Sequence, residues 1–219
     1  MFFCIQLVIE IMQIIKWLSE LATILKSRSH LFPKKYVYDF SNNFKNDLEK
    51  FIKEKSAWVT QVTLFGYLKT RMGTRHTLFF SDKVFNDAIK QASWNIYIIS
   101  LADFILYSFS YLNKSKVLNK EEAKQILVNI LKKDKEIGLS NEIFEKGIDI
   151  FSKKIANLNW ETYHKENPFK DSALALYDWA PVDIELKKLD KKIVINSMNL
   201  KWNLVQNEFI ELLKKSKII

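Results

Sequence analysis

The segment Lys69–Arg75 carries the side chains of this sequence that are best suited to binding an anion. Of the 34 basic residues only three are arginines, and two of these, Arg71 and Arg75, stand four positions apart. A guanidinium group can hold a carboxylate or a phosphate through two parallel hydrogen bonds, which a lysine ammonium cannot do. If one helix continues through the segment, Lys69, Arg71 and Arg75 form a site for a phosphate, a carboxylate or an anionic lipid headgroup.

Two structural roles would use the same residues without a ligand. Cations in the last turn of a helix interact favourably with its dipole, by about 0.3–1 kcal/mol each. Alternatively, a buried arginine of the segment bridges to Asp103 or to an acid on the last helix. The sequence leaves the binding role and both structural roles open.

Catalytic and metal-binding patterns are not found in the sequence. None of the four glycines belongs to the Gly-x-Ser-x-Gly elbow of an α/β-hydrolase, and Cys4, in an apolar stretch, is expected to be an inert core residue. Glu161 and His164 form a single Glu-x-x-His pair, whereas di-iron bundles need two such motifs and two further glutamates. His30 and His76 stand alone, so all the histidines are expected at a solvated surface, and we predict no metal and no cofactor.

The elements that must position these residues are predicted to be helices. Four glycines and three prolines in 219 residues are too few for the frequent turns of a sheet or barrel. We predict an all-α single domain over 1–219, a bundle of about six helices. Three long helices are predicted at 41–72, 81–112 and 182–215, and shorter ones at 3–26, 119–136 and 140–157, while 158–180 is expected to be irregular.

Helix ends follow from capping residues. Ser41, Ser81, Asn119 and Ser140 are predicted to begin helices, and Pro181 is predicted to occupy the first turn of the last one. Gly73 fits the left-handed position that follows a helix. Gly66, inside the helix 41–72, is expected to be compensated by close packing against another helix.

Polar positions within apolar helices mark three further features. In the N-terminal helix, within residues 1–27, a narrow polar stripe indicates a core helix or a helix lying in a membrane interface. A membrane span is the less favoured alternative, because Glu10 and Lys16 would lie within hydrocarbon. In the helix 81–112 a polar stripe that includes Asp103 favours an amphipathic or central bundle helix over a membrane span. In the last helix, Leu186, Leu189, Ile193, Asn196 and Leu200 are spaced by three and four residues, so Asn196 is expected on a buried apolar seam, where an amide can fix the register.

The net charge of +9 permits association with nucleic acid or with an anionic membrane surface. Lysine-rich composition over a solvated surface also accounts for that charge, and no RNA-binding signature is present, so nucleic acid is the less favoured partner. A single cysteine excludes an intramolecular disulfide and fits a reducing compartment. The apolar N-terminus lacks the features of a secretory signal.

Two stretches resemble a family of small helical proteins from alphaproteobacteria. The first runs from Val62 through the Lys69–Arg75 segment to Phe85. The second is Trp179-Ala-Pro-Val-Asp183, followed by residues up to Trp202. The likeness covers most of residues 45–212. Members are commonly labelled esterases, so the resemblance implies a helical fold, a bacterial cytosolic setting and hydrolysis of small esters.

The function predicted first is that of a non-catalytic accessory or interaction protein. It is expected in the cytoplasm, bound to a protein partner and peripherally associated with the inner membrane or with a larger assembly. A hydrolase acting on small esters and a module that binds anions or RNA are the alternatives. The candidate anion- or partner-binding residues are Lys69, Arg71, Arg75, Asp103, Trp179 and Asn196.

Overall fold

The structure, a computed structural model, describes residues 38–73, 82–112 and 120–219. The chain divides into two units, Met1–Tyr38 and Asp39–Ile219, and every helix described below belongs to the second. Several predictions fall outside the described residues. These are the N-terminal helix, the caps Ser81 and Asn119, and the residues Cys4, His30, Arg75 and His76.

Six α-helices and no strand make up the described part of the chain, which confirms the all-α class. The structure adds a short 3-10 turn, η4, at Tyr163–Lys165. The helices are α2 (Phe44–Met72), α4 (Lys83–Leu112), α5 (Lys120–Lys135), α6 (Asn141–Asn157), α7 (Lys170–Trp179) and α8 (Ile184–Lys215).

Local capping explains where three of the helices begin. The Ser140 hydroxyl accepts a hydrogen bond from the backbone N–H of Ile143, as predicted for a serine at this position. Asp82 accepts from the N–H of Phe85 at the start of α4. Asp183 accepts from two N–H groups at the start of α8. Pro181 therefore precedes the cap of α8, and its predicted place in the first turn is wrong.

The predicted start of α2 at Ser41 is also wrong. The Asp39 carboxylate accepts hydrogen bonds from the backbone N–H of Ser41 and from the amide of Asn42. This turn occupies the residues before the helix, which begins at Phe44. An aspartate that binds the backbone two residues later competes in this way with helix formation.

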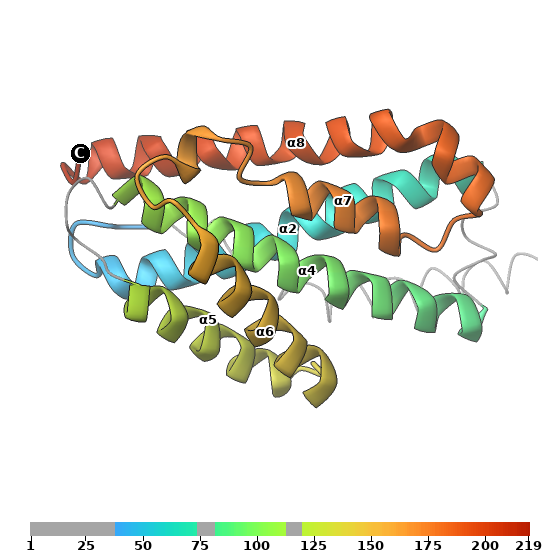
Figure 1. Cartoon of the computed structure of the whole chain (residues 1–219), viewed down its shortest axis with the longest axis horizontal. Helices are drawn as coiled ribbons and strands as arrows, with labels where there is room; N and C mark the ends of the chain where they lie inside the picture. The colour runs from blue at the N-terminus through green and yellow to red at the C-terminus, as the bar shows by residue number, and fades with distance from the viewer. Residues whose placement is uncertain (1–37, 74–81, 113–119) are drawn as a thin grey trace, which may run out of the picture. The chain divides into compact units, whose positions relative to one another are not determined.

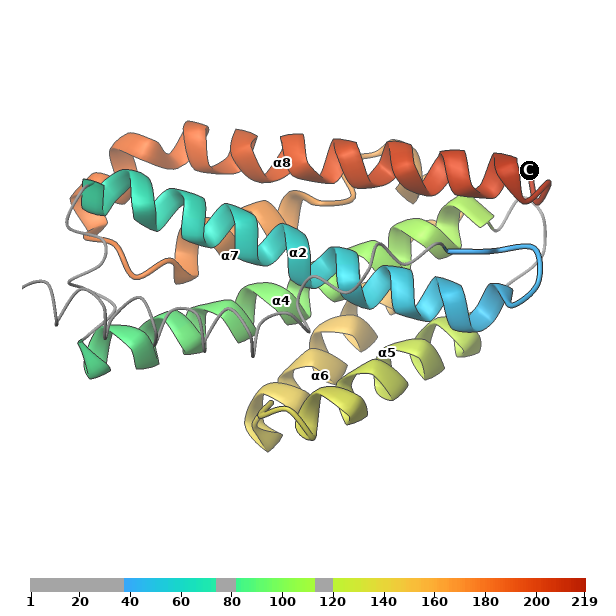
Figure 2. The ribbon, with the colours of Figure 1, turned by 180° about the vertical axis from the view of Figure 1, so that it is seen from behind.

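Helix α4 lies at the centre of the bundle and packs against α2, α5, α6 and α7, while α8 contacts α2 and α7 (Figures 1 and 2). By length and hydropathy α4 could cross a membrane, but 89% of its most apolar window is buried among the other helices. The core helix of a soluble protein can be equally long and apolar. The polar stripe of α4 likewise favours an amphipathic or central bundle helix over a membrane span.

An aromatic cluster fills the space between α4, α7 and α8. The Trp202 ring stacks on Phe169 with the ring centroids 4.2 Å apart, and it lies 5.3 Å from Phe104. Phe209 of α8 contacts Phe104 and also Phe51 of α2. Fully buried aromatic side chains of this size contribute much of the stability of a core, so the cluster fixes which face of α8 points inward.

The two glycines inside helices, Gly66 and Gly147, differ in how closely other helices pack against them. A Cβ atom at Gly66 would meet no atom of the described residues within 4 Å, so the expected close packing there is wrong. A Cβ atom at Gly147, in α6, would lie 3.2 Å from Leu131 and 3.6 Å from Ile98. It is therefore Gly147 that allows α6 to approach α5 and α4 closely. Gly73 ends α2 with a positive φ of 57°, as predicted for a glycine.

Candidate functional site

Arg71 is paired within the bundle. Its guanidinium group donates a hydrogen bond to the carboxylate of Asp190 on α8, and the Tyr67 hydroxyl donates to the second oxygen at 2.9 Å. The Asp190 side chain is only 4% exposed, while that of Arg71 is 34% exposed. Of the roles left open by the sequence, the structure thus shows the bridge to an acid on the last helix.

The predicted anion site is not assembled by the residues that the structure describes. Lys69 is exposed, and Arg75 lies outside the described residues. Asp103 is not the partner of Arg71, because its carboxylate binds groups from α6 and α7. The described part of the site therefore consists of one arginine committed to Asp190 and one exposed lysine.

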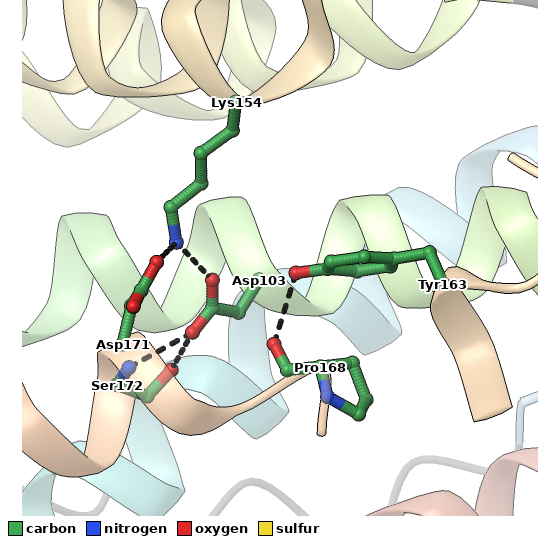
Figure 3. A network of polar contacts seen from close by, with 6 residues as sticks. All are labelled: Asp103, Lys154, Tyr163, Pro168, Asp171 and Ser172. Atoms are coloured by element: carbon green, nitrogen blue, oxygen red, sulfur yellow. Dashed lines mark hydrogen bonds and ion pairs between the residues drawn. The ribbon is translucent and has the colours of Figure 1, made fainter. Parts of the chain in front are cut away.

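Asp103 instead organises a buried polar network between α4, α6 and α7 (Figure 3). One oxygen accepts from the ammonium group of Lys154, which also lies 2.7 Å from Asp171. The other oxygen accepts from the backbone N–H of Ser172 at 2.9 Å and from the Ser172 hydroxyl. In the same view Tyr163 points toward Pro168 and donates to its carbonyl oxygen at 3.0 Å.

The network supplies α7 with its N-terminal cap. The local cap residue of α7, Phe169, makes no side-chain hydrogen bond, so the carboxylate of Asp103 takes over this role from another helix. A negative charge is favourable at this end of a helix dipole. Because the cap is 69 residues away in sequence, α7 could not be recognised locally, and the prediction of an irregular segment 158–180 is wrong for Lys170–Trp179.

Burial dominates the electrostatics of this network. It raises the pKa of Asp103 above the usual range, while the nearby Lys154 and the bonds from Ser172 act in the opposite direction. Burial alone would lower the pKa of Lys154, but its interactions with Asp103 and Asp171 outweigh that effect and raise the pKa. The ammonium group therefore stays charged beside the carboxylate, as expected for a structural ion pair.

A third buried carboxylate, Asp134 of α5, repeats the same arrangement. It lies 2.7 Å from the ammonium of Lys53 and accepts a 2.8 Å hydrogen bond from the Tyr97 hydroxyl. Each of the buried acids Asp103, Asp134 and Asp190 thus receives one cation and one hydroxyl from other helices. A buried charge with such partners joins helices. All three carboxylates are paired within the fold, so none of the three is available to bind a ligand.

Ser110 and His164 form a serine–histidine contact with Nδ1 2.9 Å from the hydroxyl oxygen. The geometry does not suit nucleophilic catalysis, because Ser110 is fully buried and its hydroxyl donates to the carbonyl of Trp160. His164 is half-buried against Tyr111, so its expected place at a solvated surface is wrong. Within the described residues, no group of three acids, histidines or cysteines could hold a metal ion.

Trp179, at the end of α7, is half-buried against α6. The ammonium group of Lys146 lies 4.4 Å from the ring centroid, and the same group donates to the side chain of Asn95. A cation over an indole ring is attracted to it, by about 0.5–1 kcal/mol at exposed positions. The face of the Trp179 indole ring that Lys146 covers therefore makes a contact within the protein itself.

The outer face of α8 is the surface that sequence reasoning misplaced. The seam predicted to be buried is exposed, since Leu189 is 79%, Ile193 70% and Leu200 63% exposed, and Asn196 is exposed as well. Leu186 and Leu204 extend the same face. We call these five aliphatic residues the α8 stripe: Leu186, Leu189, Ile193, Leu200 and Leu204.

The opposite face of α8 is buried because it carries the larger side chains. Its buried residues are Asp190, Val194, Met198, Trp202, Val205, Phe209 and Leu213. This series contains two aromatic residues and continues to the end of the helix, whereas the aliphatic series ends at Leu204. Its length and its aromatic content are sequence features that favour it as the core face, but two apolar lines share this helix and only packing decides between them. Helix α8 forms the upper edge of the bundle in both ribbon views, with α2 and α7 below it (Figures 1 and 2).

Comparisons with protein-family models, with curated proteins and with solved structures find no match for this chain. The resemblance to the alphaproteobacterial family therefore stays a prediction.

Proposed function

We propose that this chain is a non-catalytic interaction protein of the bacterial cytoplasm, which binds a partner protein through the α8 stripe. One observation carries the proposal, namely five aliphatic side chains aligned on the solvent-facing side of a helix whose other side is core. Single exposed aliphatic residues are common, but an aligned series on one surface is typical of an interaction site.

The polar groups of the described residues support the same conclusion. The buried carboxylates of Asp103, Asp134 and Asp190 are satisfied by cations and hydroxyls of the chain itself. The buried Ser110 donates its hydroxyl to a backbone carbonyl. These groups are used in joining helices, whereas the five side chains of the stripe face solvent in an aligned series.

Affinity purification of the tagged full-length protein from its native cell, read by mass spectrometry, tests the proposal. The test variant is Leu189→Ser/Ile193→Ser. The matched control is Ile137→Ser, which removes a side chain that is 69% exposed at the end of α5, away from the stripe. We expect a partner that is retained by the control, lost at least about tenfold in the test variant, and bound directly when both proteins are purified. Equal recovery with both variants would contradict the proposal.

The hydrolase alternative rests on the family resemblance, and the contact between Ser110 and His164 is where it can be tested, although the geometry of that contact does not suit catalysis. Turnover of short-chain aryl esters by the purified protein, lost in Ser110→Ala, would support it. Thr63→Ala is a suitable comparison, because it removes another buried hydroxyl that donates to a backbone carbonyl. Absence of turnover in the wild-type protein, or turnover that Ser110→Ala leaves unchanged, would remove this site from consideration.

A further inference from the structure

We draw no further inference here: the strongest candidate, the exposed aliphatic stripe along the outer face of α8, already carries the proposed function, and nothing in the structure shows what covers it.

Discussion

Arg71 of α2 and Asp190 of α8, 119 residues apart in sequence, form an ion pair in which the Tyr67 hydroxyl shares the carboxylate. The pair joins two of the long helices of the bundle. A substitution at Arg71 is therefore expected to destabilise the fold. A loss of binding in such a variant would not by itself show that Arg71 contacts a ligand.

We therefore expect Arg71→Ala to destabilise the protein by up to about 3 kcal/mol, because it leaves the buried carboxylate of Asp190 without its cation. Lys69→Ala, two positions earlier and exposed, should change the free energy of unfolding by less than about 0.5 kcal/mol. Urea unfolding of both variants measures the difference. Equal effects would show that the pair contributes nothing to stability.

The capping role of Asp103 predicts a local effect. Asp103→Ala should increase amide hydrogen exchange in α7, since the N–H of Ser172 loses its acceptor, more than in α5, which Asp103 does not contact. Lys154→Met should destabilise by about 3–5 kcal/mol in urea unfolding, because the fully buried carboxylate of Asp103 loses its cation and keeps only the hydrogen bonds from Ser172. Hydrogen exchange read by mass spectrometry tests the effect of Asp103→Ala. Uniform acceleration of exchange across all helices would argue against a local cap.

The two helical glycines should respond in opposite directions. Gly66→Ala should stabilise the protein by up to about 1 kcal/mol, since alanine favours the helix and its Cβ meets no described atom. Gly147→Leu should destabilise by about 1–3 kcal/mol or more, because Leu131 and Ile98 occupy the space. Thermal unfolding of the two variants side by side tests this, and a stable Gly147→Leu protein would contradict the close approach of α6.

Substitutions on the two faces of α8 should differ in how much they lower the free energy of unfolding. Met198→Ala should cost about 2–5 kcal/mol, because the Met198 side chain is fully buried. Leu189→Ala should cost less than about 0.5 kcal/mol, because Leu189 is 79% exposed. Denaturant titrations measure both. A large loss in Leu189→Ala would mean that the stripe is covered within the protein itself.

Stability should fall at alkaline pH. Burial raises the pKa of Tyr107 to about 12, and it raises the pKa of Tyr97 well above the usual value, with Asp134 adding to the effect. A folded-state pKa above the unfolded value of about 10 means that the stabilisation is complete below pH 10 and is lost as the pH rises toward 12.

Tyr107→Phe isolates one of these contributions. The variant should lose less stability than the wild type between about pH 10 and 12, with the difference approaching about 2 kcal/mol at the upper end. The comparison uses the slope with pH, since the substitution also removes a hydrogen bond with Gln206. Parallel slopes for the two proteins would show that Tyr107 does not titrate in this range.

Much of the helical architecture could be predicted because its signals are local. The scarcity of glycine and proline indicated helices, and the cap at Ser140 and the long apolar series of α2, α4 and α8 marked their extent to within a few residues. The polar stripe through Asp103 favoured an amphipathic or a central bundle helix, and the structure shows the central one, since 89% of the most apolar window of α4 is buried among the other helices.

The candidate site could not be predicted in the same way. Periodicity showed that α8 carries an apolar line through Leu189 and Ile193, but two such lines share this helix, and only packing against Phe104 and Phe169 selects the one with Trp202 as core. The sequence determined the helices, because capping and periodicity act over a few residues. The tertiary structure alone decided the partners of Arg71 and Asp103, the existence of α7 and the exposed face of α8, because these depend on contacts between residues far apart in the chain.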